Sequence, residues 1–347
     1  MPSKFLSAAP QKLSWPLVPF VVVMLIAALS GGCTQIQDLI TPTPNVPGEW
    51  NALLHDIRAF EQRIGFQETQ NFQTKFDAKG DFSICGYAPR TQLPYSYQDP
   101  MIRWGDARNA QDCAAAAKDE DVYFTQVEAV GEIGTAVTST MIDGKLDRFI
   151  YLVIHENCHD QFDLPYGIEE ALCNLLGYRG MAAFSEEKYG AKAREDRAIR
   201  RYAESQSKLT HAVVGYYRQI EQLYARYAKK EITLEALMRE RARLFAGAER
   251  TFGWRRQAMN NVALANEMTY SRHYAQLEAV YDRLGRDLTK TVAFFRKVDA
   301  AKPTRDAIRK RYRLSEGSVE LVKAYEDAVM ATVESLLNPA PATLPRR

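Results

Sequence analysis

The sequence lacks several features that would assign it to a common class of protein. Its 45 basic and 43 acidic residues leave a net charge of only +2, so there is no basic excess with which to bind nucleic acid. The five cysteines include no closely spaced pair, which argues against a metal site built from cysteine. No internal repeat is visible. With 46% hydrophobic and 25% charged residues, the composition is that of an ordinary globular protein.

Histidine is also scarce, yet two of the five histidines stand four residues apart, in Ile154–His159. In a helix, residues four apart lie on the same face, so His155 and His159 would present two imidazoles to one metal ion. Glu156 would lie about 100° further round, close enough to act on water without occupying the metal. This is the HExxH arrangement, with two zinc ligands and a carboxylate general base.

The residues before the motif favour a helix. Asp143-Gly144 supplies a start, and apolar residues then recur with helical spacing at Leu146, Phe149, Ile150, Val153, Ile154 and Cys158. The alternative is that Phe149–Ile154, which contains β-branched residues, forms a buried strand. The two histidines would then point apart and the motif would have no chemical meaning.

A third ligand follows in Tyr166–Gly177. Its apolar stripe consists of Ile168, Leu172, Leu175 and Leu176. Glu170 shares a different face with Asn174 and Gly177, which keep that face small and polar. We therefore expect Glu170 to complete three protein ligands, with the fourth position left for water. Glu169 is the competing ligand, and in the alternative interpretation both glutamates are solvated surface acids.

This pattern resembles the zinc peptidases in which HExxH is followed by a glutamate ligand on the next helix, the gluzincin type. More narrowly, it resembles the bacterial family called putative aminopeptidases, from about residue 50 to residue 300. The segments that carry the resemblance are Val127–Gly134, Ser139–Met141, His155–His159, Glu169–Leu172 with Gly177, and Asn260–Ala265 with Thr269-Tyr270. The family's Asn-Glu pair aligns with Glu169-Glu170, which again favours Glu170 as the ligand.

The resemblance implies a zinc-dependent peptidase. Zinc would lower the pKa of water toward neutrality, and Glu156 would accept a proton from that water and pass it to the leaving amine. The oxyanion needs a second electrophile, for which the candidates are Tyr270, His273 and Tyr274. The family likeness favours Tyr270.

The chain also departs from the family. The interval from His159 to Glu170 is shorter, Asn157-Cys158 replace a more typical Leu-Ala pair, and Gly131–Gly134 replace Ser-Thr-Leu-Gly. The likeness therefore supports a metallopeptidase better than an aminopeptidase, which would need an acid such as Glu132 or Glu169 to bind the substrate's α-amine. An endopeptidase acting on envelope proteins, and a non-catalytic scaffold or binding lipoprotein, remain alternatives.

Residues 1–33 have the pattern of a bacterial lipoprotein signal. Lys4 and Lys12 precede an apolar run, Pro16–Ser30, that is too short for a permanent membrane span. The run ends in small residues before Cys33, which we expect to be lipidated. Thr34 rather than Asp follows, which in that class indicates the periplasmic face of the outer membrane. An ordinary cleaved signal or an uncut anchor is the alternative.

Beyond the signal, we expect a proline-rich tether at 34–49, a catalytic domain at 50–337 and a disordered tail at 338–347. The fold class is α+β and predominantly α, mixed over 50–180 and helical over 181–337. The expected elements are helices at Glu49–Ile64, Ala107–Lys118 and Asn261–Leu284, strands at Phe82–Tyr87 and Val122–Val130, a helix capped by Thr233, and further helices after Asp287 and Ser318. The end of the second strand is either a substrate-binding edge or an internal core strand.

Export exposes the chain to an oxidising compartment, so an even number of cysteines beyond Cys33 invites disulfides. Cys85 and Cys113 form the natural pair. Cys158 and Cys173 would lie on the two ligand helices and could also pair, although we expect buried free thiols there.

Overall fold

The computed structural model describes residues 43–338, except for 77–81, 107–112, 114 and 128–133. From Thr43 onward the chain forms one compact unit. The expected signal peptide, the lipidated Cys33, the tail after Asn338 and most of the helix expected at Ala107–Lys118 lie outside the described residues. The structure is predominantly helical with small sheets, which confirms the expected α+β class.

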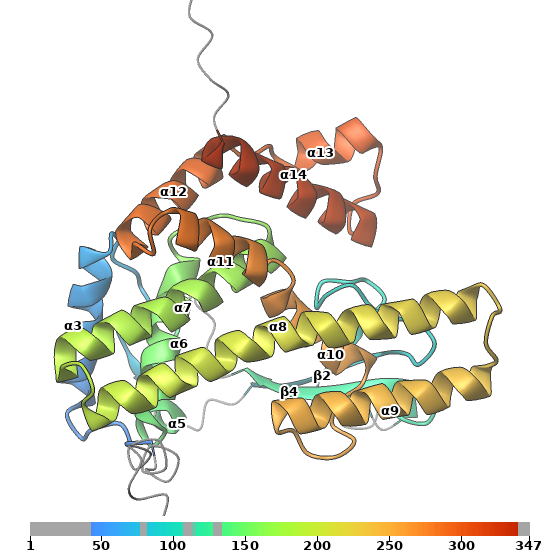
Figure 1. The fold of residues 1–347 in the computed structure, drawn as a ribbon, viewed down its shortest axis with the longest axis horizontal. Helices are drawn as coiled ribbons and strands as arrows, with labels where there is room; N and C mark the ends of the chain where they lie inside the picture. Colours follow the sequence, from blue (N-terminus) through green and yellow to red (C-terminus); the bar gives the residue numbers. More distant parts are fainter. Residues whose placement is uncertain (1–42, 77–81, 107–112, 114, 128–133, 339–347) are drawn as a thin grey trace, which may run out of the picture. The chain divides into compact units, whose positions relative to one another are not determined.

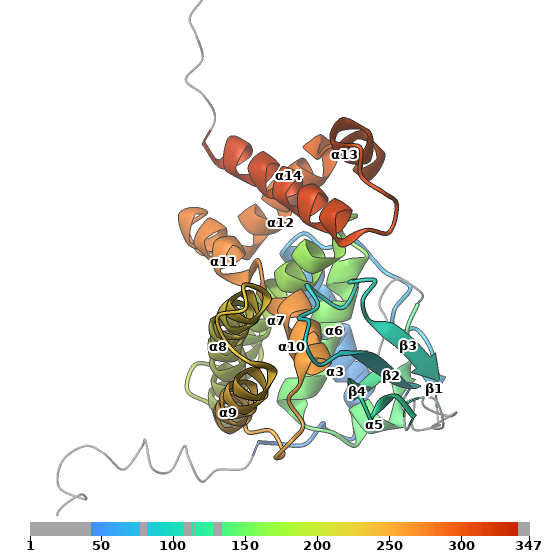
Figure 2. The same cartoon turned by 90° about the vertical axis from the view of Figure 1, so that its right-hand side faces the viewer.

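Three antiparallel strands form the larger sheet (Figure 2). Strand β2 (Phe82–Pro89) lies in the middle, between β3 (Arg103–Asp106) and β4 (Glu120–Val127). Among the described strands β4 is therefore at an edge, as the substrate-binding alternative requires. A second sheet pairs two residues of β1 (Lys75–Phe76) with two of β5 (Val137–Thr138) in parallel. The expected disulfide between Cys85 of β2 and Cys113 is present.

Helices make up most of the remaining described chain (Figure 1). They are α3 (Trp50–Arg63), α5 (Ser139–Ile142), α6 (Leu146–His159), α7 (Tyr166–Tyr189), α8 (Arg194–Ala228), α9 (Leu234–Phe252), α10 (Asn261–Ser271), α11 (Tyr274–Arg283), α12 (Leu288–Ala301), α13 (Arg305–Tyr312) and α14 (Val319–Leu337). The long α8 runs beside α7 and then beside α9, and α10 lies between α8 and the sheet (Figure 1). In the described part of the chain, no helix combines the length and hydrophobicity needed to cross a membrane.

Helices α6 and α7 occupy the middle of the main core. The segment Phe149–Ile154 lies within the helix α6, so the strand alternative is wrong. Phe149, Ile150 and Ile154 are fully buried on this helix. Gly177 and Gly180 of α7 let α6 and α7 approach closely. A Cβ atom at Gly177 would lie 3.2 Å from the ring of Tyr151. A larger side chain there would require the ring of Tyr151 to shift.

The expected cap at Thr233 and the expected helices after Asp287 and Ser318 are confirmed. The side chains of Thr233, Asp287 and Ser318 each accept a hydrogen bond from the backbone N–H three residues further on, at the starts of α9, α12 and α14. The single helix expected over Asn261–Leu284 is wrong, because the chain is interrupted between α10 and α11. At this break Arg272 lies 3.6 Å from the centroid of the Tyr95 ring, and His273 Nε2 lies 2.9 Å from Glu326 Oε2.

The end of the expected tether is also different from the prediction. Pro44 accepts a hydrogen bond of 2.9 Å from the backbone of Leu146, and the Val46 N–H donates to Gly144 over 3.2 Å. Asn45 pairs with Lys145 in a β-bridge. The segment is extended, as its prolines favour, but it is docked on the start of α6. It therefore supplies one of the acceptors that the first turn of a helix needs.

Candidate metal centre

Helices α6 and α7 bring three donor atoms together. His155 and His159 lie one turn apart at the end of α6, with their Nε2 atoms 3.3 Å from each other. The Oε2 atom of Glu170, from the second turn of α7, lies 3.2 Å from His155 Nε2 and 3.5 Å from His159 Nε2. All three side chains are buried, and their donor atoms form a cluster that could hold a metal ion.

The spacing of the donors fits one ion. In a tetrahedral metal centre with bonds of about 2.0–2.1 Å, neighbouring ligand atoms are about 3.3–3.4 Å apart. The three observed distances of 3.2–3.5 Å agree with this value. In addition, Glu170 Oε2 is a buried oxygen without a hydrogen-bond donor in the described structure. A cation at the centre would satisfy that oxygen.

The other nitrogen of each imidazole is held by a neighbouring side chain. The hydroxyl of Tyr151 donates to Asn174 Oδ1 over 2.5 Å, so its oxygen is left to accept from His155 Nδ1 at 3.3 Å. His159 Nδ1 lies 2.8 Å from Glu169 Oε1. With a metal ion bound, these contacts would keep the protons on Nδ1 and leave both Nε2 lone pairs for the ion. Such outer contacts fix the tautomer and the ring orientation of metal-binding histidines.

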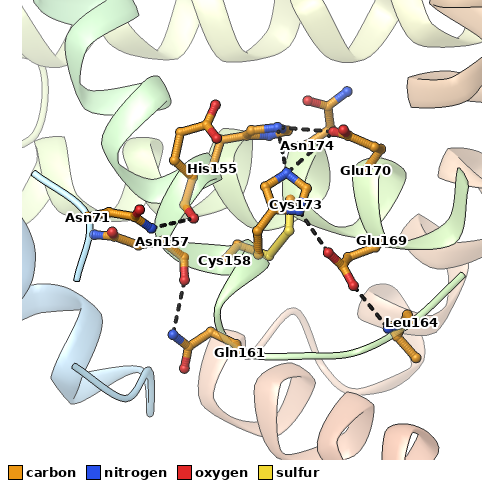
Figure 3. Close-up of a disulfide and its surroundings, with 12 residues drawn as sticks. Asn71, His155, Asn157, Cys158, Gln161, Leu164, Glu169, Glu170, Cys173 and Asn174 are labelled. Atoms are coloured by element: carbon orange, nitrogen blue, oxygen red, sulfur yellow. Dashed lines mark hydrogen bonds and ion pairs between the residues drawn. A yellow bond between two sulfur atoms is a disulfide. The ribbon is translucent and has the colours of Figure 1, made fainter. Parts of the chain in front are cut away.

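The geometry distinguishes the two adjacent glutamates of α7. Besides its contact with His159, Glu169 accepts a hydrogen bond of 2.9 Å from the backbone of Leu164 (Figure 3). It therefore orients a histidine and closes the loop between α6 and α7, whereas Glu170 points into the donor cluster. Each residue is only 4% exposed, so the interpretation of both as solvated surface acids is wrong.

The charges of the cluster stabilise one another. Burial alone would raise the pKa of Glu170, but contacts with His155 and His159 lower it to about 2. Burial alone would lower the pKa of His159, but Glu169 and Glu170 raise it to about 11. The carboxylates therefore create a negative environment at the convergence point, which is suited to a cation.

A disulfide joins Cys158 to Cys173, so the expectation of free thiols is wrong. Cys158 immediately precedes His159, and Cys173 lies one turn after Glu169 and Glu170 on α7 (Figure 3). The Cα atoms of the two cysteines are 5.5 Å apart, because α6 and α7 cross closely at this level. The bond ties the two ligand helices together directly behind the donor cluster.

The two expected catalytic side chains lie near the donors. Glu156 is buried on α6 and influences the ionisation of both His159 and Tyr270. The ring centroid of Tyr270, on α10, is 6.4 Å from that of His155. The charge of Glu170, together with burial, raises the pKa of Tyr270 well above its ordinary value. Tyr270 is therefore a protonated hydroxyl and a hydrogen-bond donor at neutral pH.

The other candidates for the second electrophile are engaged elsewhere. His273 pairs with the buried carboxylate of Glu326, and the Tyr274 hydroxyl donates to Ser207 Oγ over 3.0 Å. Of the three candidates, only Tyr270 has its ring close to that of a histidine of the metal cluster, His155.

Three further tyrosines near the donors were not predicted. Tyr151 and Tyr166 stand four residues before His155 and Glu170, so helical spacing alone could have found them. Burial and the nearby carboxylate of Glu170 raise the pKa values of Tyr166 and Tyr97. Tyr97 comes from a loop held by Thr269, whose hydroxyl accepts the Tyr97 N–H over 2.9 Å. No local pattern in the sequence marks it.

Comparison with known families agrees with this site. Residues 104–312 match the family described as Putative aminopeptidase. The chain belongs to this family. The matched region is more than half of the sequence and contains the whole of α6, α7 and α10. Searches among curated proteins and among solved structures find no match. Membership supports peptidase activity and, with it, peptides or proteins as substrates.

Proposed function

We propose that this member of the family is a zinc-dependent aminopeptidase carried on a lipid-anchored envelope protein. The observation that carries the proposal is the convergence of His155 Nε2, His159 Nε2 and Glu170 Oε2, with Glu156 beside them on the same helix. Three protein donors of the nitrogen and oxygen type are typical of catalytic zinc, which keeps its fourth position for water. A scaffold without catalytic activity would not need the general base.

The zinc ion would supply Lewis acidity, lowering the pKa of water toward neutrality and polarising the peptide carbonyl. The carboxylate of Glu156 accepts a proton from the attacking water and transfers it to the nitrogen of the leaving amine. The hydroxyl of Tyr270 donates a hydrogen bond to the carbonyl oxygen as negative charge develops there. Tyr151 and Glu169 keep the two imidazoles oriented throughout.

The test is a metal determination combined with a digest of a peptide library. We expect about one zinc per chain, removal of single residues from peptide N-termini, loss of activity on chelation and its return with added zinc. Internal cleavage would favour an endopeptidase acting on envelope proteins. A purified chain that binds no zinc, or a zinc-loaded chain that leaves all peptides intact, would contradict the proposal.

The proposed anchor is Cys33, at the end of the apolar run in residues 1–33. Two disulfides in the described structure support export to an oxidising compartment. Cys33→Ser should release the protein from the membrane fraction or leave the precursor uncut. Labelling with a fatty-acid analogue and cell fractionation measure this. Unchanged processing and membrane retention in the variant would exclude lipidation at Cys33.

A further inference from the structure

One face of α10 is more open than the rest of the helix. Asn266, Glu267 and Tyr270 are half-buried, whereas most other residues of α10 are buried. Residues three and four apart lie on the same side of a helix, so these three side chains form one polar face. Tyr270 shows the direction of that face, because its ring lies 6.4 Å from the ring of His155.

The placement of α10 sets Glu267 between the sheet and the metal cluster. At the start of the helix, Asn260 Nδ2 donates to the backbone of Val122 in β4 over 2.8 Å. At its other end, Asn174 of α7 donates to the backbone oxygen of Tyr270 over 3.4 Å. Glu267 precedes Tyr270 by one turn, about 4.5 Å along the helix axis. It is therefore close to the proposed reaction centre without belonging to the donor cluster.

Glu267 is not balanced by a positive charge from any residue that the structure describes. Within the described residues it forms no ion pair, and its hydrogen bond from Asn266 Nδ2 is long, at 3.5 Å. Burial raises the pKa of Glu267 to about 7, and the hydrogen bond from Asn266 offsets only part of this effect of desolvation. The carboxylate thus lies on the half-buried face of α10 that carries Tyr270, without a cationic partner among the described residues.

The other acids near the site already have roles. Glu170 belongs to the donor cluster, and Glu156 lies beside it on α6. Both oxygens of Glu169 are engaged, by His159 and by the backbone of Leu164, so this residue is not available to bind a substrate amine. Glu132 lies outside the described residues.

We propose that Glu267, with Asn266 beside it, binds the free α-ammonium group of the peptide substrate. This inference rests on the proposed peptidase function and names the group that the site recognises. When the first residue is removed from a peptide, its α-nitrogen is separated from the attacked carbonyl carbon by a single carbon atom. An acid that recognises this nitrogen must therefore lie near the metal cluster, and Glu267 stands one turn before Tyr270, whose ring lies 6.4 Å from that of His155. The ammonium group supplies the positive charge, and its N–H groups donate to Glu267 more strongly than the long hydrogen bond from Asn266 does.

The same chemistry would suit the side-chain ammonium of a lysine at the first position, and the experiment must separate the two sources. Parent and Glu267→Gln are compared on leucine p-nitroanilide, on its N-acetyl form and on N-acetyl-lysine p-nitroanilide. For Glu267→Gln we expect kcat/KM on the free-amine substrate to fall by about 10- to 100-fold, mainly through KM, because a hydrogen bond to a charged group is lost. Activity on the two acetylated substrates and zinc content should not change.

Binding without turnover provides a second measurement. In a Glu156→Gln background, the tripeptide Leu-Gly-Gly should bind at least about 10-fold more tightly than its N-acetyl form, and Glu267→Gln should remove this preference. Glu267→Asp should restore part of it, which a purely structural role would not predict. The matched control is Glu235→Gln, on the exposed surface of α9, where the side chain is 90% exposed and no change is expected.

Each outcome has a separate meaning. If Glu267→Gln keeps the preference for free amines, the assignment to Glu267 is wrong while the aminopeptidase remains. If the parent cleaves acetylated leucine and free leucine substrates equally well, recognition of the α-amine is wrong while the peptidase remains. If Glu267→Gln loses activity only on acetylated lysine, the residue binds a side chain instead. A parent without zinc or peptidase activity overturns both proposals.

Discussion

The helix pair α6–α7 and the polar face of α10 both border the metal cluster, but their side chains differ in burial and in hydrogen bonding. On α6 and α7, the donor side chains are buried, and both histidines are fixed by a further side chain, Tyr151 or Glu169. On α10, Glu267 is half-buried and only loosely bonded. A metal site gains from rigid donors, because donors that are already oriented lose little conformational entropy when the ion binds. A substrate site must stay open, because its ligand enters and leaves.

The largest expected effect lies within the rigid pair, between neighbouring residues of α6. Glu156→Gln retains the size of the side chain but removes the proton acceptor, so kcat should fall by about 10²- to 10⁴-fold with zinc still bound. His155→Ala removes a donor instead, so zinc and activity should be lost together. Zinc content and peptide hydrolysis are measured on both purified variants.

The two variants make the result decisive, because each serves as the control for the other. Hydrolysis by Glu156→Gln at the rate of the parent would show that Glu156 is not the general base. Full zinc occupancy in His155→Ala would show that the cluster is not the metal site.

An effect of intermediate size is expected on zinc affinity, which should distinguish the roles of Glu169 and Glu170. Glu170→Gln replaces a charged donor by a neutral one and should abolish stoichiometric zinc binding at micromolar zinc. Glu169→Gln removes only the carboxylate partner of His159 Nδ1, so zinc affinity should fall by about 10- to 100-fold. At a high zinc concentration this variant should still bind zinc. Competition with a chelating dye measures both affinities. The reverse order would make Glu169 the ligand.

The sequence predicts the rigid pair better than the open face. The HExxH helix and Glu170 follow from spacing within single helices, where side-chain positions depend only on the helical repeat. The bond between Cys158 and Cys173 depends on where two helices cross, and the position of Tyr97 depends on a loop. These are tertiary features without a local signal.

The break between α10 and α11 has the same origin. The apolar pattern continues through Asn261–Leu284, but the ring contacts of Arg272 and the ion pair of His273 hold the chain in a different direction. Glu267 was not predicted for a related reason. Helical spacing places it on the face of Tyr270, but only the packing of α10 in the fold turns that face toward the metal cluster. The docking of Pro44 on α6 likewise depends on the folded partner.

The smallest expected effect concerns the disulfide that holds the rigid pair together. Replacing Cys158 and Cys173 by serine reopens a loop with a sequence separation of 15, which should cost about 3 kcal/mol in the free energy of unfolding. The helices should still pack, because their core remains. Since the bond lies beside His159 and one turn from Glu170, its loss should also loosen the donors and weaken zinc binding by about 10-fold, a change of the size produced by altering outer contacts.

The second disulfide is the matched control for this prediction. Cys85 and Cys113, with a sequence separation of 28, lie at the sheet rather than at the ligand helices. Replacing both by serine should lower the free energy of unfolding by a similar amount, about 3–4 kcal/mol, without changing zinc affinity. Urea unfolding of the zinc-free proteins and dye competition give the two quantities. Equal zinc affinities in the two double variants would mean that packing alone positions the donors, because the Cys158–Cys173 bond would then add stability without adding rigidity to the metal site.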